Sequence, residues 1–335
     1  MLRIMTLFWF KIHLCTNDLF CQVQNCVEAS PKLLTKPVLL ISFVYKRNGR
    51  HCVIRYAKPN KVGDALALLA TDSWRILAGG TDFYPSHAGK PQIENVLDIN
   101  NLAELRGISQ TPEHWIIGAS TTWTDLVRSS LPSAFGGLKQ AALQVGSLQI
   151  QNAGTIAGNL CNASPAADGT PALLTLDAEV ALRSSDATRW LSLSDFVLGN
   201  RKTARLPHEL VTAIRMPKRS CEGRAAFLKL GARHYLVISI AMVAARIEMR
   251  GDRIAAASLA VGSCSAVAQR LRGVERAILG LRWHETEDAV RAAPMLEIAP
   301  IDDVRGSAGY RRQIVPELVL RVLNQVLIEA AETQQ

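Results

Sequence analysis

The sequence contains no apolar segment long enough to cross a membrane. A transmembrane helix needs about 18 or more consecutive apolar residues, and no run in this 335-residue chain reaches that length, although 48% of its residues are hydrophobic. The apolar stretch 4–10 follows Arg3 as in a signal peptide, but Lys11 ends it and no small-residue cleavage site follows. We therefore expect a cytoplasmic protein with no membrane partner.

Several motifs that mark common enzyme classes are also missing. Neither G-x-G-x-x-G nor G-x-x-x-x-G-K-[ST] is present, which weakens a Rossmann or a P-loop assignment. The chain lacks the G-x-S-x-G elbow, and its seven histidines form no zinc-binding pair. Seven cysteines without paired or ferredoxin-type spacing fit a reducing compartment rather than a disulfide framework. We expect neither a metal site nor an iron–sulfur cluster in this chain.

The positive charge is unevenly distributed along the sequence. A net charge of +9 would by itself suggest a nucleic-acid partner. Residues 1–50, however, hold seven basic and two acidic side chains, so more than half of the excess lies there. The rest of the chain carries too little excess charge for nucleic-acid binding, and we expect no such partner.

A regular pattern begins near Arg55. Val62, Ala65, Leu66 and Leu69 have the spacing of one helical face. Alternating elements of this kind are typical of an α/β or α+β domain. Helices are expected over residues 62–69, 122–128 and 138–145, and strands over 74–78, 95–99, 115–118, 179–183 and 210–216.

A polar, turn-rich stretch at residues 217–223 separates this part from a second one. There, the apolar runs 237–247 and 254–261 flank a tight turn, which predicts a hairpin. A terminal amphipathic helix is expected with Pro316 in its first turn. These features predict an irregular extension over 1–54 that need not belong to the native protein, one domain over 55–222 and another over 223–335.

Two glycine-bearing polar segments could bind a ligand. In the first, an apolar strand ends at Gly79-Gly80, where backbone N–H groups can converge on an anion, although an ordinary tight turn explains the pattern equally well. The second, residues 149–171, interleaves Asn, Ser, Thr and Gly with small apolar residues. Its Asp168 could accept ribose hydroxyls or cap a helix over 172–176, with Pro171 at its start, and spacing alone favours the cap.

Four strings together resemble a known family: LAGGTD, VLDINNLAELRGI, IGASTTWTDL and QIQNAGTIAGNLCNASPAADGTPALLTLDAEV. They are similar to the FAD-binding medium subunit of the molybdenum hydroxylases, the group of xanthine dehydrogenase and carbon monoxide dehydrogenase flavoproteins. The resemblance runs from about Arg55 to the C-terminus. It implies an α+β fold, with a two-subdomain FAD-binding domain of the vanillyl-alcohol-oxidase (PCMH) type and a small α+β C-terminal domain with an antiparallel sheet.

The resemblance also implies which residues bind FAD. The Leu77–Phe83 loop corresponds to the family's pyrophosphate loop. Lys229 matches a lysine that reaches the flavin region. Without the resemblance, the sequence around Lys229 favours a solvated residue at a strand edge. Gln151 and Ala157 depart from the Arg and Gly that the family commonly has there. The residues so assigned are Leu77, Ala78, Gly79, Gly80, Thr81, Asp82, Phe83, Val145, Thr155, Gly158, Asn159, Ser164, Asp168, Val211 and Lys229.

The function that this resemblance implies is electron transfer within a heterotrimer. A large molybdopterin-binding subunit would oxidise the substrate, a small subunit with [2Fe–2S] clusters would carry the electrons, and FAD in this chain would pass them to NAD or another acceptor. A xanthine dehydrogenase-like complex is favoured, with no catalytic residue of the hydroxylation in this chain. The alternative is a stand-alone FAD oxidase or diaphorase, for which His234 and Tyr235 are the strongest candidate bases. We expect the functional chain to begin close to Arg55.

Overall fold

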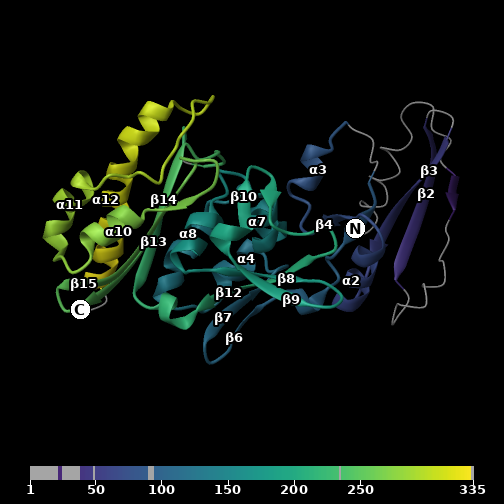
Figure 1. Cartoon of the computed structure of the whole chain (residues 1–335), viewed down its shortest axis with the longest axis horizontal. Coiled ribbons are helices and arrows are strands. Elements are labelled where there is room, and N and C mark those ends of the chain that lie inside the picture. Colours follow the sequence, from purple (N-terminus) through teal and green to yellow (C-terminus); the bar gives the residue numbers. More distant parts are fainter. Residues whose placement is uncertain (1–21, 25–37, 48–49, 90–93, 234, 333–335) are drawn as a thin grey trace. The chain divides into compact units, whose positions relative to one another are not determined.

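A computed structural model describes residues 22–24, 38–47, 50–89, 94–233 and 235–332 (Figure 1). The described chain divides by packing into two compact units. Unit 1 comprises the described residues within 1–106, 183–188 and 206–210, and unit 2 comprises those within 107–182, 189–205 and 211–335. The N-terminal apolar run, Cys15, Cys21, Cys26 and His234 lie outside the described residues.

Unit 1 is built on a five-stranded sheet. β2 (Leu39–Arg47) and β3 (Arg50–Lys58) form an antiparallel hairpin, and β3 and β4 (Arg75–Leu77) pair in parallel with β5 (Val96–Asp98). β1 (Gln22–Gln24) completes the order β1-β2-β3-β5-β4. The expectation of an irregular extension over 1–54 is therefore wrong for the residues in β2 and β3, which pair along their whole length.

Helix α2 (Val62–Thr71) covers this sheet with the face that the spacing predicts. Val62, Ala65, Leu66 and Leu69 are buried in one cluster with Leu97 of β5. At the carboxyl end of β4 the chain turns through a short loop into α3 (Phe83–Ser86). The 3-10 turn η1 (Ala103–Leu105) follows β5 near the end of this stretch of unit 1.

The first part of unit 2 is a mixed layer of sheet and short helices. Its sheet has the order β6-β7-β12-β8-β9, and Trp123, Phe135 and Phe196 lie in the core beside it. The strands are β6 (Ile108–Gln110), β7 (His114–Gly118), β8 (Glu179–Arg183), β9 (Thr188–Ser192), β12 (Leu210–Pro217) and the separate pair β10 (Val197–Gly199) and β11 (Lys202–Thr203). The helices are α4 (Trp123–Arg128), η2 (Ser133–Phe135), α5 (Gly136–Leu143), α6 (Leu148–Ala153), α7 (Ile156–Asn162), α8 (Gly169–Thr175), α9 (Leu193–Phe196) and η3 (Lys218–Cys221).

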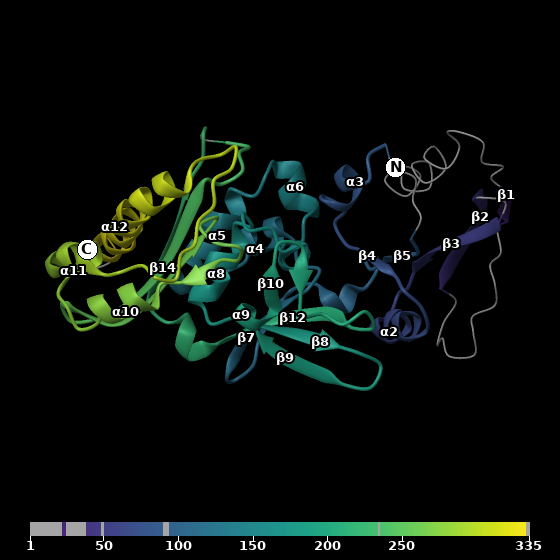
Figure 2. The same cartoon turned by 45° about the horizontal axis from the view of Figure 1, so that its top comes forward.

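The second part of unit 2 is a four-stranded antiparallel sheet with helices on both faces. Its strands are β13 (Arg224–Leu230), β14 (Ala241–Arg250), β15 (Arg253–Gly262) and β16 (Gln269–Arg270), in that order. Figure 2 shows α12 (Ala308–Glu332) on one side of β14 and α5 on the other. The remaining elements are α10 (Arg272–Ile278), η4 (Trp283–Glu285) and α11 (Thr286–Ala292).

Burial on both faces explains the long apolar run that forms β14. Met242 and Ala244 belong to the core shared with α5 and α8, whereas Val243 and Ala245 belong to the core under α12. Because successive strand residues point to opposite faces, both sets must be apolar. The sheet thereby joins both parts of unit 2 into one packed body, although the sequence places a domain boundary at 222/223, which stays a prediction.

The predicted hairpin is confirmed, and two details of the helices are corrected. β14 and β15 pair from Met242↔Gly262 to Arg250↔Arg253. α12 begins at Ala308, so Pro316 lies inside this helix and not in its first turn. α8 begins at Gly169, which makes Pro171 its third residue. Within the described residues, no helix combines the length and the apolar character needed to cross a membrane.

Candidate functional site

In unit 1, the loop after β4 is shaped as the glycine pair predicts. Gly80 has φ +73°, and a β carbon there would lie 2.5 Å from Tyr84 Cε2. Two hydrogen bonds from the segment after β5 fix the backbone carbonyls at the start of this loop. Leu77 O accepts from Ile99 N at 2.9 Å, and Ala78 O accepts from Asn100 Nδ2 at 2.8 Å.

The N–H groups of the same loop are available to a ligand. Within the described part of the chain, no hydrogen bond is donated by the backbone N–H of Gly79, Gly80 or Thr81. Consecutive N–H groups in such a turn form an anion-binding concavity. Asp82 precedes α3, and the buried Phe83 ring stacks on His87 with centroids 4.6 Å apart, which anchors the end of the loop.

In unit 2, the polar strip 149–171 folds into three short helices rather than one open loop. Thr155 caps α7, because its Oγ1 accepts from Gly158 N at 3.0 Å. A β carbon on Gly158 would lie 2.7 Å from that oxygen. Ala163 ends the helix in the left-handed conformation with φ +48°, and Ser164 Oγ accepts from Ala166 N at 3.2 Å.

One polar atom of this strip is buried without a partner. Asn159 Oδ1 has no hydrogen bond within the described chain. A buried oxygen without a donor costs free energy, so most such groups in proteins are paired. A hydroxyl of a bound ligand would supply the missing donor. Each feature taken by itself fits a group that FAD offers: phosphate oxygens suit the N–H groups of the first loop, and a ribityl or ribose hydroxyl suits Asn159 Oδ1.

Asp168 does not cap α8, contrary to what its spacing favours. Its side chain makes no capping hydrogen bond. Instead, Oδ2 lies 2.7 Å from Lys229 Nζ, and Oδ1 accepts from Ser239 Oγ at 2.7 Å. Burial raises the pKa of Asp168, against the lowering effects of the Lys229 charge and of both hydrogen bonds.

Lys229 is not a solvated strand-edge residue. Only 7% of its side chain is exposed, and Nζ also donates to Gln144 O at 3.3 Å. Val145, next in the chain, is partly buried against the core, and Val211 in β12 is buried. The structure thus brings Asp168, Lys229 and the residue before Val145 together.

Two further residues clarify this region. Ser239 is fully buried and lies 71 positions from Asp168 inside an apolar run, so no local sequence pattern points to it. Gln151, which stands where the family commonly has Arg, is buried, and its Nε2 donates to Leu143 O at 3.0 Å. The amide is therefore bonded within unit 2, to the end of α5. Tyr235, a candidate base for the alternative of a stand-alone oxidase, is 74% exposed.

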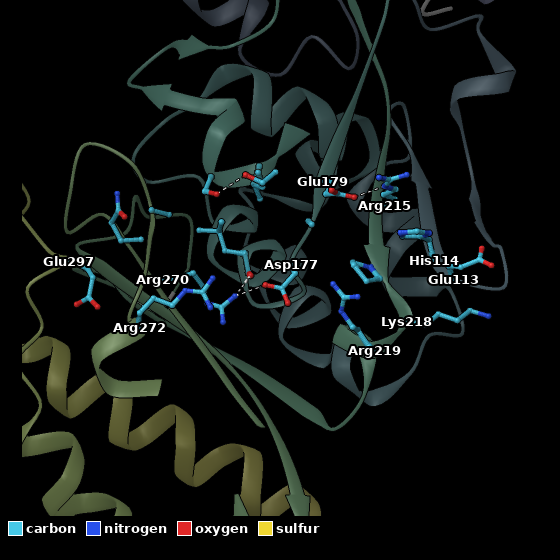
Figure 3. Close-up of a pocket in the computed structure, with 18 residues that line it drawn as sticks. Glu113, His114, Asp177, Glu179, Arg215, Lys218, Arg219, Arg270, Arg272 and Glu297 are labelled. Atoms are coloured by element: carbon cyan, nitrogen blue, oxygen red, sulfur yellow. Dashed lines mark hydrogen bonds and ion pairs between the residues drawn. The ribbon is translucent and has the colours of Figure 1, made fainter. Parts of the chain in front are cut away.

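A separate cavity of about 980 Å³ lies in unit 2 and is lined by none of the predicted site residues (Figure 3). Two ion pairs join charged side chains of its lining. Arg215 Nε lies 2.5 Å from Glu179 Oε2, and Arg270 Nη1 lies 2.8 Å from Asp177 Oδ1. Arg270 also bonds Glu275 at 2.6 Å, so its guanidinium group has little capacity left for a ligand.

Comparison with known proteins identifies relatives that cover about four-fifths of this chain. Residues 52–219 match the model of the FAD binding domain in molybdopterin dehydrogenase, and residues 226–326 match that of the CO dehydrogenase flavoprotein C-terminal domain. The carbon monoxide dehydrogenase medium chain of Hydrogenophaga pseudoflava is 30% identical over 80% of this chain and 95% of its own length. The xanthine dehydrogenase FAD-binding subunit of Escherichia coli O157:H7 is 28% identical over 82% and 96%. In a solved structure of Cu,Mo-CO dehydrogenase, one chain is similar with a TM-score of 0.73 and 27% identity, over 81% of this chain and 96% of that one.

Proposed function

Because this chain belongs to the family of FAD-binding medium subunits of the molybdenum hydroxylases, we propose that it is the electron-transfer flavoprotein of a heterotrimeric hydroxylase. Its partners would be a large molybdopterin-binding subunit and a small subunit with [2Fe–2S] clusters. Bound FAD supplies the chemistry, since a flavin accepts electrons singly and releases them in pairs. The acceptor would be NAD or another oxidant, in a complex of the xanthine dehydrogenase type.

The proposal assigns FAD-binding groups in unit 1 and, separately, in unit 2. In unit 1, the N–H groups of Gly79, Gly80 and Thr81 hold phosphate oxygens, because fixed dipoles bind an anion with little reorganisation. Leu77, Ala78, Asp82 and Phe83 shape that loop. In unit 2, the cofactor contacts come from Val145, Thr155, Gly158, Asn159, Ser164, Asp168, Val211 and Lys229.

The observation that carries the proposal is the buried pair of Asp168 and Lys229. The two side chains are 9% and 7% exposed and 61 positions apart in the sequence. An ion pair is costly to bury, so its retention in this place is easier to explain by a ligand than by stability. The carboxylate keeps acceptor capacity for cofactor hydroxyls, and the ammonium group places a fixed positive charge in the site.

Exposed apolar side chains in the segment after β13 support partner docking over a stand-alone oxidase. In the segment between β13 and β14, Leu236 is 57% exposed and Ile238 is 65% exposed. Neighbouring exposed apolar side chains often mark an interaction surface. A partner subunit on this surface would remove them from water.

Purification of the native complex tests the proposal. The expected result is co-purification of this chain with two other subunits, in a preparation that contains FAD, molybdenum and iron–sulfur clusters. A matched preparation with the chain's Asp168→Ala variant should retain the subunits and lose flavin. Substrate oxidation by this chain alone, without molybdenum or iron–sulfur partners, would contradict the proposal.

A further inference from the structure

The Asp168 carboxylate is held from two sides. Lys229 bonds one oxygen from β13, and the Ser239 hydroxyl bonds the other, each at 2.7 Å. An ionised carboxylate accepts about four hydrogen bonds. Two acceptor positions therefore remain for a ligand, while the two protein donors fix the plane of the group.

Ser239 is itself anchored in the fold. It is fully buried two residues before the start of β14, and its carbonyl accepts from Arg305 Nη1 at 3.0 Å. Arg305 Nη2 in turn lies 2.6 Å from Asp303 Oδ2. Arg311, also fully buried, bonds Asp303 and the carbonyl of Ile240. The hydroxyl is thus presented from a backbone position that two arginines of the C-terminal segment hold in place.

We infer that Ser239 is a positioning residue of the FAD site, whose hydroxyl keeps the Asp168 carboxylate in the orientation that binds Lys229 and leaves acceptor positions for the cofactor. This inference rests on the proposed function, in which Asp168 and Lys229 contact FAD. Ser239 acts through Asp168 and need not touch the cofactor. Its loss would weaken FAD binding without removing any cofactor contact.

The electrostatics around Asp168 give this role a pH signature. Lys229 is the charged group that faces the carboxylate, since α7 and α8 carry no charged side chain and the next charges beyond Ser239 are Arg305 and Asp303. Burial raises the pKa of Asp168, and the Ser239 hydrogen bond lowers it. Without the hydroxyl, one buried oxygen lacks a donor, so the pKa rises further. The pH below which FAD affinity falls should then move upward.

The test measures FAD affinity of the full chain against pH by flavin fluorescence. Ser239→Ala should weaken binding near neutral pH by about 10- to 100-fold, as expected for losing a hydrogen bond to a charged group. The acid limb of its pH profile should lie at higher pH than in the wild type. Ser239→Cys has a similar size and a weaker donor, so its FAD affinity should lie between those of the wild type and Ser239→Ala. This variant keeps the test decisive if Ser239→Ala does not fold.

A matched control is Ser220→Ala. Ser220 is also buried and donates to a carboxylate, that of Asp177, at 2.7 Å. Because Asp177 lines the separate cavity, this variant should leave FAD affinity and its pH profile unchanged. If Ser239→Ala behaves like Ser220→Ala while Asp168→Ala still loses FAD, the inference is overturned and the proposed function stands. If Asp168→Ala and Lys229→Met also bind FAD with full affinity, the cofactor assignment itself fails.

Discussion

Gly169 lies directly against the Trp123 indole ring, so that a β carbon on Gly169 would be 2.4 Å from Cη2 of the tryptophan. Gly169 is the first residue of α8, and Trp123, only 1% exposed, is the first residue of α4. The contact places Asp168, the preceding residue, against the core of unit 2. Close approach of the two helices thus depends on the missing side chain.

Gly169→Ala should therefore destabilise the protein. Extra methyl groups in a packed core typically cost about 1 to 3 kcal/mol, and the variant should also bind FAD less tightly because Asp168 must shift. Gly309→Ala is the control, since a β carbon there meets nothing closer than 3.9 Å. Urea unfolding of both variants measures the difference, and equal unfolding free energies would contradict the packing argument.

Removal of the Lys229 charge should be costly. Lys229→Met leaves the Asp168 carboxylate buried without its cation, which typically costs about 3 to 5 kcal/mol. The double variant Lys229→Met/Asp168→Asn should recover much of that loss, because no uncompensated charge remains. Lys202→Met, at an exposed lysine in β11, serves as the control in the same unfolding measurement. A double variant no more stable than Lys229→Met would contradict the claim that the unpaired Asp168 charge causes the loss of stability.

Two glycines with the same backbone conformation separate strain from site geometry. Gly80 and Gly89 both have φ +73°, but a β carbon at Gly89 meets nothing within 4 Å, whereas one at Gly80 meets the Tyr84 ring. Alanine at either position should cost about 1 to 2 kcal/mol of stability. Only Gly80→Ala should weaken FAD binding, by about tenfold or more. Calorimetric titration with FAD measures both affinities. Equal affinities of the two variants would contradict phosphate binding by the loop at residues 79–81.

Acid should remove a stabilising contribution from Asp303. Hydrogen bonds from Arg305 and Arg311 hold the pKa of Asp303 well below its ordinary value. A group with a lowered folded-state pKa stabilises the fold above its unfolded pKa of about 4, and the contribution disappears as the pH falls through the folded-state value. Asp303→Asn should cost about 1 kcal/mol at pH 7 and progressively less below pH 4.

The comparison for this effect is Asp288→Asn. Asp288 is exposed in α11, and its replacement should change the free energy of unfolding by less than about 0.5 kcal/mol at either pH. Unfolding curves collected from pH 7 to pH 2 measure both variants. A constant difference between wild type and Asp303→Asn over this range would refute the assignment.

Local sequence patterns were sufficient for much of the fold. Spacing alone placed the buried face of α2, and the turn at residues 250–253 between two apolar runs predicted the β14–β15 hairpin. Pro316 predicts a later start for α12 than the structure has. Packing against β13 and β14 sustains the helix through a proline that would otherwise end it. Propensity is a weak guide where tertiary contacts stabilise an element.

Local sequence chemistry was enough to reveal the family, the turn at the Gly79-Gly80 pair and the segments that form most strands and helices. These depend on short-range chemistry: glycine at a positive φ, apolar periodicity and a specific polar string. The contacts of Asp168 with Lys229 and Ser239, in place of a cap on α8, become visible only in the folded chain. The partners lie 61 and 71 positions away, and no local pattern encodes such a contact. It arises because the carboxylate is buried by packing of the sheet against α8, where an unpaired charge would be too costly to keep.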